Sequence, residues 1–146
     1  MTKEEKQLLL KDLASRLSYG VICKGINKYF DIDKDKYIVD REVVGPLTDI
    51  GYDYCTLGLT QKCRLSTVRP YLRPMESMTE EEYKEYRKAG ERDTLDSAEA
   101  LKQKAAGKRY ISSWYRGTDW LLKNYFDFRG LIAKGFALEA PKDMYN

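Results

Sequence analysis

The sequence predicts an α+β fold: an N-terminal helix, a small antiparallel sheet or partly closed barrel over about 20–74, and a helical C-terminal half with a docked extended tail. Three observations lead to this prediction. Apolar residues recur at helical spacing near the N-terminus. Val, Ile, Tyr and Thr then dominate, with turn residues at short intervals. After residue 75, capping residues and glycines delimit further helical segments.

The size of the chain fits one folded unit. Its 146 residues, of which 42% are apolar and twelve are Tyr, suffice for a domain with a sizeable core. We expect a single domain over 1–146, in which 1–75 holds the first helix and the β-rich part, and 76–146 is mainly helical. The formal net charge of +3 is too small to imply a polyanionic partner by itself.

The first predicted helix covers residues 3–17. Thr2 and Glu5 have the spacing of a capping box, and Gly20 follows as a stop signal. The apolar residues recur three or four positions apart: Leu9, Leu10, Leu13, Ala14 and Leu17.

The next segment predicts a run of short strands. The candidates are 20–24, 27–32, 37–44, 52–58 and 61–68. Because no helical pattern separates these strands, they should pair antiparallel as a meander or a small barrel. Pro70 and Pro74 are expected to end the paired region, since proline cannot donate a hydrogen bond to a strand ladder.

Two helices are expected in the acidic middle of the chain. Ser77 or Thr79 should cap a helix over about 79–91, which ends near Gly90. A second helix is expected over about 95–106. The stretch 108–116 fits either a strand or a helix.

The last helix is expected in "DWLLKNYF", capped by Thr118 or Asp119 and ended by Gly130. Its apolar face would consist of Trp120, Leu121, Tyr125 and Phe126. The following tail, "GLIAKGFALEAP", is rich in apolar residues, so it should return to the core as an extended segment or one short strand. Only the residues after Pro141 are expected to be loose.

The residue types exclude several chemistries. Without histidine, a Ser-His-Asp triad, a Cys-His pair and a His-ligated metal site are impossible. Cys23, Cys55 and Cys63 are odd in number and lack C-x-x-C spacing, which predicts buried free thiols and no metal or cofactor. If 52–58 and 61–68 form a hairpin, Cys55 and Cys63 could face each other.

The N-terminal stretch "MTKEEKQLLLKDLASRL" is not typical of a signal peptide, because acids precede its short apolar run. No stretch approaches the ~18 apolar residues of a membrane span. These features predict a cytoplasmic protein without a membrane partner.

The stretch "DIDKDKYIVDRE", residues 31–42, places acids where a calcium-binding EF-hand loop carries its ligands. The sixth place of such a loop requires the sharp turn that glycine permits, and here it is Lys36. Gly25 and Gly45-Pro46 interrupt the flanks where helices would be needed. We therefore predict a β-hairpin with "KDK" as its turn, and no calcium ion.

The stretch "LTQKCRLSTVRPYLR" contains four basic residues and no acid. On a strand, Lys62 and Arg64 share one face, and Tyr71 lies between Arg69 and Arg73 further along. Cations with an interleaved aromatic ring can bind phosphate and stack on a base, so these five residues are candidates for nucleic-acid binding. The alternative is a solvated strand face without a ligand.

A second candidate surface is "RYISSWYRGTDW", with two Trp, two Tyr and two Arg. Trp114, Tyr115 and Arg116 are candidates for binding a partner, since these residue types are frequent anchors at interfaces. The alternative is a buried contact between the C-terminal helix and the sheet.

The leading functional prediction is a non-enzymatic binding module for a protein or nucleic-acid partner. The first alternative is specifically a nucleic-acid-binding protein that uses the basic strand face. The second is a hydrolase or transferase that uses Asp119, Asp127 and Glu139 as acid–base groups. No phosphate-binding glycine loop or nucleophile elbow accompanies these carboxylates.

Three stretches carry a resemblance to a family: "LLLKDLASRLSYGV", "RPYLRPMESMTEEE" and "DWLLKNYFDFRGLIAKGFALEAPKDMYN". They resemble small proteins, without an established activity, from gut anaerobic bacteria and their prophages. The resemblance covers the two ends and the junction, and is weaker over 25–60 and 92–110. It implies a single intracellular domain, encoded by a mobile element, and it brings no catalytic residues.

Overall fold

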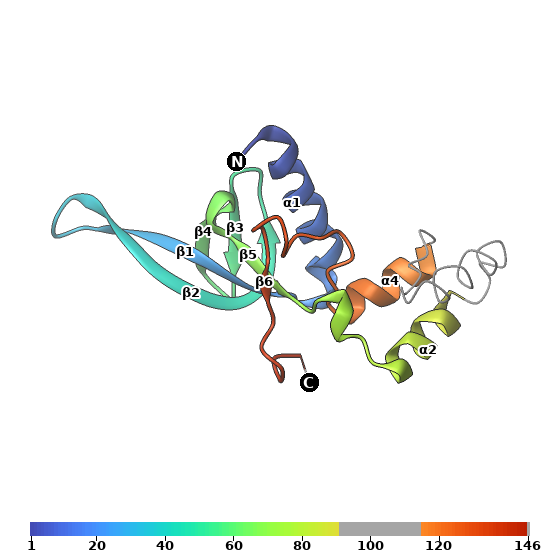
Figure 1. Ribbon diagram of the computed structural model, residues 1–146. Helices are drawn as coiled ribbons and strands as arrows, with labels where there is room; N and C mark the ends of the chain where they lie inside the picture. Colours follow the sequence, from blue (N-terminus) through green and yellow to red (C-terminus); the bar gives the residue numbers. More distant parts are fainter. Residues whose placement is uncertain (91–114, 146) are drawn as a thin grey trace.

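The computed structural model describes residues 1–90 and 115–145 (Figure 1). The predicted α+β fold is confirmed, while the expected helix over 95–106 and the stretch 108–114 lie outside the described residues. In chain order the elements are α1 (Lys3–Arg16), the 3-10 turn η1 (Leu17–Tyr19), β1 (Ile22–Asp31), β2 (Lys36–Ile50), β3 (Tyr54–Leu57), β4 (Gln61–Arg64), η2 (Leu65–Thr67), β5 (Arg69–Leu72), η3 (Met75–Ser77), α2 (Glu80–Ala89), α4 (Tyr115–Lys123) and β6 (Leu138–Glu139).

Helix α1 begins at the predicted capping box. The Glu5 amide donates to the Thr2 hydroxyl over 3.1 Å, and the Thr2 amide donates to the Glu5 carboxylate over 2.7 Å. Both bonds satisfy amides that have no partner within the first turn of a helix. At the other end, Gly20 takes the left-handed conformation with φ 63°, which turns the chain into β1.

Four strands form a closed ring, which confirms the predicted barrel-like sheet. β1 pairs with β2, β2 with β3 and β3 with β4, all antiparallel. The ring closes because Asn27 of β1 also pairs with Cys63 of β4. The short strands β3 and β4 form a hairpin in which Cys55 lies directly opposite Cys63.

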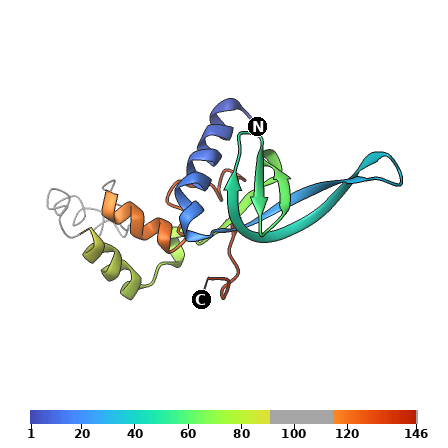
Figure 2. The ribbon, with the colours of Figure 1, turned by 180° about the vertical axis from the view of Figure 1, so that it is seen from behind.

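The far half of the β1–β2 hairpin projects beyond this ring. Figures 1 and 2 show its tip at the opposite end of the molecule from α2 and α4. The turn lies at residues 32–35, where Asp35 has a positive φ of 47°. The predicted hairpin over 31–42 is confirmed, although its turn comes slightly earlier than "KDK". The acidic stretch is therefore flanked by strands and not by the helices of an EF-hand.

The predicted end of the sheet at Pro70 is wrong, because β5 runs through this residue. Pro70 pairs with Cys23 of β1, on one side of β5 only. A proline is tolerated at such a strand position because no second neighbour needs its missing amide hydrogen. Further along, Tyr71 and Leu72 pair with β6 in parallel, so the tail forms the predicted short strand.

Helix α2 agrees with its prediction, whereas α4 does not. Thr79 and Glu82 form a second capping box at the start of α2, and Gly90 follows its end. In contrast, α4 begins at Tyr115, so Thr118 and Asp119 lie inside the helix and do not cap it. It also ends at Lys123, well before Gly130.

The larger buried cluster, called here the ring cluster, fills the space between α1, the strand ring and the tail. It consists almost entirely of aliphatic side chains and thiols: Leu9, Leu13, Val21, Cys23, Leu47, Cys55, Leu57, Cys63, Leu65, Val68, Leu72, Leu131 and Ala137. All three cysteines are free and buried, as predicted. Burial raises the pKa of Cys55 to about 11 and raises that of Cys63.

The smaller cluster, called here the helix cluster, lies where α2 meets α4 and is mostly aromatic. Its buried members are Met78, Tyr83, Tyr86, Leu121 and Phe126. The Trp120 ring extends it by lying 5.8 Å from the ring centres of both Tyr86 and Phe126.

A buried ion network joins the two clusters. Asp12 and Arg16 of α1 are fully buried and form two hydrogen bonds of 2.8 and 3.1 Å. The Arg16 guanidinium also donates to the carbonyl of Phe126 over 2.8 Å, and Arg129 donates to Asp12 over 2.6 Å. The network therefore ties α1 to the segment that leaves the helix cluster.

The tail docks on the ring cluster, as predicted, through the buried side chains of Leu131 and Ala137. Contrary to prediction, its order extends beyond Pro141. The Tyr145 ring stacks on Tyr125 at 3.7 Å, and its hydroxyl donates to the carbonyl of Tyr71 over 2.5 Å. These contacts also help to hold Tyr125 at its unusual φ of 63°.

Candidate nucleic-acid interface

Lys62 and Arg64 lie on the outer face of β4, as the alternation in the sequence predicts. Both are exposed, whereas Cys63 between them is buried in the ring cluster. The closed ring thus fixes which side of this strand faces solvent, because its other side has to fill the core.

An exposed tyrosine adjoins these two cations on the neighbouring strand. Tyr54 of β3 lies directly opposite Arg64, and 42% of its surface is accessible. The ammonium group of Lys62 lies 5.2 Å from the centre of its ring. An exposed aromatic ring beside two cations matches the contacts that single-stranded nucleic acids make through bases and phosphates.

The turn before β3 adds a second exposed ring and an ion pair. Tyr52 is 74% accessible, and the ammonium group of Lys6 lies 3.9 Å from its ring centre. The same ammonium donates to the Asp53 carboxylate over 2.9 Å, and this hydrogen bond raises the pKa of Lys6. Lys6 is therefore charged at neutral pH and held by contacts on two sides.

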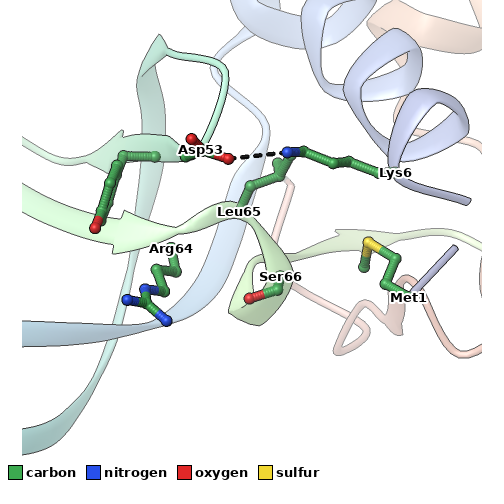
Figure 3. Close-up of a pocket in the computed structure, with 7 residues that line it drawn as sticks. Met1, Lys6, Asp53, Arg64, Leu65 and Ser66 are labelled. Carbon is green, nitrogen blue, oxygen red and sulfur yellow. Dashed lines mark hydrogen bonds and ion pairs between the residues drawn. The ribbon is translucent and has the colours of Figure 1, made fainter. Parts of the chain in front are cut away.

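Lys6, Asp53 and Tyr54 border a cavity of about 410 Å³ between the start of α1 and the β3–β4 hairpin. Figure 3 shows the Lys6 ammonium turned toward Asp53, with the side chains of Arg64 and Ser66 projecting from the adjacent segment. The cavity is lined by Met1, Lys6, Asp53, Tyr54, Arg64, Leu65 and Ser66. Its size is within the ~300–1,000 Å³ range of small-molecule sites.

Tyr52, Tyr54 and Lys6 were not predicted from the sequence as residues of this site. The signal for the two tyrosines is the alternation in "GYDYC", which places them two residues apart before a buried cysteine. To relate that signal to Lys62 and Arg64 requires the register of the β3–β4 hairpin, and Lys6 joins only through the packing of α1.

The other three basic-stretch candidates take part in contacts within the protein. Arg69 donates to the carbonyl oxygens of Gly135, Ser66 and Val68, and its burial lowers the pKa of the guanidinium. The Tyr71 carbonyl accepts the bond from Tyr145 described above. Neither residue adjoins Tyr54 on the β3–β4 face.

Arg73 forms two hydrogen bonds of 2.7 and 2.8 Å with Glu82, next to the capping box of α2. Its guanidinium also lies 4.2 Å from the ring centre of Phe126. The bond from Arg73 lowers the pKa of Glu82. These contacts position Arg73 to link β5 with both helices.

Of the partner-binding candidates, Trp114 lies outside the described residues, and Tyr115 and Arg116 form the start of α4. The three candidate acid–base carboxylates have separate surroundings. Asp119 accepts a bond from the Tyr19 hydroxyl, Asp127 accepts bonds from two amides of the tail, and Glu139 is exposed on β6.

Within residues 1–90 and 115–145, no group of three or more carboxylates and thiols has the arrangement of a metal site. None of the helices in these ranges has the length and apolar character needed to cross a bilayer.

Comparisons with protein-family models, with curated proteins and with solved structures give no significant match to the chain. The resemblance to small proteins of gut anaerobes and their prophages therefore stays a prediction.

Proposed function

We propose that the chain is a non-enzymatic binding module that holds single-stranded nucleic acid on the outer face of β3 and β4. The observation that carries this proposal is the exposed Tyr54 ring beside Lys62 and Arg64. In this mode the two cations contact successive phosphates, and one base stacks on the ring.

The arrangement favours a single strand over a duplex. A tyrosine ring can stack on a base only where that base is unpaired and splayed out. Both cations lie on one short strand, β4. Arg64 forms no ion pair with any of the described residues. Arg64 can therefore exchange bound counterions for a phosphate without first breaking an internal bond.

Binding is measured by fluorescence anisotropy with a labelled oligothymidylate over about 50–200 mM salt. The double variant Lys62→Ala/Arg64→Ala should bind more weakly at low salt. Its slope of log affinity against log salt should fall in magnitude by about 1.4, since each phosphate contact on a single strand contributes about 0.7.

The matched control is Lys84→Ala/Arg87→Ala, which removes one lysine and one arginine from exposed positions of α2. It changes the net charge equally and should leave the salt slope unchanged. In the same assay, Tyr54→Ala should weaken binding by about 1–3 kcal/mol, while Tyr54→Phe should retain it. Equal losses in the two double variants, or no binding by the unaltered protein, would refute the proposal.

A further inference from the structure

We infer that the cavity beside Tyr54 receives one unpaired base of the bound strand and prefers guanine. This inference rests on the proposed function and adds base preference to it. Three observations support it: the position of the cavity, the paired charges on its wall and the stacking surface at its edge.

The cavity adjoins the proposed path of the strand. Tyr54 and Arg64 line it and also belong to the outer face of β3 and β4. A strand held on that face therefore passes the opening, and its volume of about 410 Å³ suffices for a base with part of its sugar. A base that enters it meets the ring of Tyr54, and stacking on such a ring occurs with any base.

Preference for one base comes from Lys6 and Asp53. Their 2.9 Å ion pair presents an ammonium donor beside a carboxylate that has two acceptor oxygens. The ammonium is bound to Oδ1, and Oδ2 accepts no side-chain hydrogen bond from the described residues. The cavity wall thus offers one donor next to two acceptors.

Guanine has the complementary pattern on its pairing edge. Its O6 accepts from the ammonium, and its N1–H and N2–H groups donate side by side to the carboxylate. Adenine, cytosine and thymine each have a single donor group on this edge, so they can use only one of the two oxygens. Charge-assisted bidentate bonds are stronger than single ones, which favours guanine.

The placement of the acid argues against a phosphate in the cavity. Asp53 would repel a second anion, even though Lys6 neutralises part of its charge. Arg64 and Ser66, which project from the next segment in Figure 3, are in contrast suited to the sugar and phosphate of the same nucleotide.

The test uses the full chain and four labelled oligothymidylates, of which three carry a single central guanine, hypoxanthine or adenine. Anisotropy should show about tenfold tighter binding of the guanine strand than of plain oligothymidylate, as expected for a bidentate base contact. Hypoxanthine, which lacks the N2 amino group, should lose most of this advantage, and adenine should show none.

The variant Asp53→Asn keeps an acceptor for Lys6 but replaces one carboxylate oxygen by a donor. It should bind all four strands within about twofold of one another, because the bidentate acceptor is gone. Thermal unfolding of Asp53→Asn checks that the exposed substitution leaves the fold intact.

The outcomes separate this inference from the function on which it rests. If all four strands bind equally well to the unaltered protein, base preference is refuted while strand binding stands. If guanine is preferred equally by Asp53→Asn, the assignment to Asp53 is refuted. If no strand binds, both proposals are refuted.

Discussion

The ring cluster and the helix cluster differ in the side chains that they bury and in the elements that supply them. The ring cluster is aliphatic and draws on α1, all strands of the ring and the tail. The helix cluster depends on a few large rings placed on two short helices and the segment after them. What joins the clusters is charged: Asp12 and Arg16 are both fully buried, and Arg16 reaches the backbone of Phe126.

This difference indicates that stability depends on steric fit within the ring cluster and on ion pairing between the two clusters. Within the ring cluster, strand register decides which side chain meets which neighbour, so steric fit is tight. Between the clusters, the free energy depends on keeping every member of the ion network paired. Three experiments follow from this division and are given in order of the expected effect.

The largest effect is expected for Asp12→Ala. It leaves the buried guanidinium of Arg16 without its carboxylate, and breaking a buried pair in this way costs about 3–5 kcal/mol of unfolding free energy. Urea denaturation measures the change. The double variant Asp12→Leu/Arg16→Met, which removes both charges, should be more stable than the single variant.

The matched control is the exposed ion pair between Lys24 and Glu42, with a 3.1 Å separation. Glu42→Ala should change the unfolding free energy by less than about 1 kcal/mol, because solvent screens this pair. Equal effects of Asp12→Ala and Glu42→Ala would show that the two clusters are not held together by the buried network.

A smaller loss is expected for Gly25→Ala in β1, which tests steric fit in the ring cluster. The added methyl group would lie 2.9 Å from the sulfur and 3.0 Å from the Cβ of Cys63, closer than packed atoms allow. Overpacking of this kind costs about 1–3 kcal/mol, as measured by urea denaturation. Met78→Leu, a swap of similar volume in the helix cluster, should cost less than about 1.5 kcal/mol. If Gly25→Ala is as stable as the unaltered protein, the ring cluster can accommodate an extra methyl group and its packing at Gly25 is not tight.

The smallest effect is expected from ionisation of the Cys55 thiol at alkaline pH. Burial raises the pKa of Cys55 from 9.0 to about 11, so the folded state holds this proton more tightly than the unfolded state. Its contribution is complete below pH 9 and is lost as the pH rises toward 11. At pH 10 this one thiol should lower the unfolding free energy by roughly 1 kcal/mol relative to pH 7.

The change in unfolding free energy between pH 7 and pH 10 is compared for the unaltered protein and Cys55→Ala. The variant should lose roughly 1 kcal/mol less over this interval, although Cys23 and Cys63 continue to contribute. An identical pH dependence in the two proteins would show that Cys55 is accessible to hydroxide in the folded state.

Local signals in the sequence predicted the elements that local chemistry determines. The capping box of Thr2 and Glu5 and the hairpin that opposes Cys55 to Cys63 were both correct. The errors occur where distant segments decide. Pro70 is accepted in β5 because its strand has a neighbour on one side only at that residue, and Tyr145 is ordered because Tyr125 and Tyr71 receive it.

The candidate site was likewise predictable only where neighbouring residues in the sequence determine it. Lys62 and Arg64 follow from alternation along one strand. Arg69 and Arg73 belong to the same basic stretch, but both form hydrogen bonds within the protein. Arg69 donates to backbone carbonyl groups, and Arg73 donates to Glu82. Tyr54 and Lys6 join the site through strand register and helix packing, which a single sequence does not reveal.

Closure of the strand ring also affects the tendency of this protein to aggregate in concentrated solution. An open strand edge can template backbone pairing with a second copy and so lead to aggregation. The edges left open here include the far half of the β1–β2 hairpin and the outer side of β6. The hairpin turn carries the charges of Asp33, Lys34 and Asp35, and β6 is two residues long and closely followed by Pro141. Charge, brevity and proline each oppose edge-to-edge pairing, so the fold protects the backbone that its ring leaves unpaired.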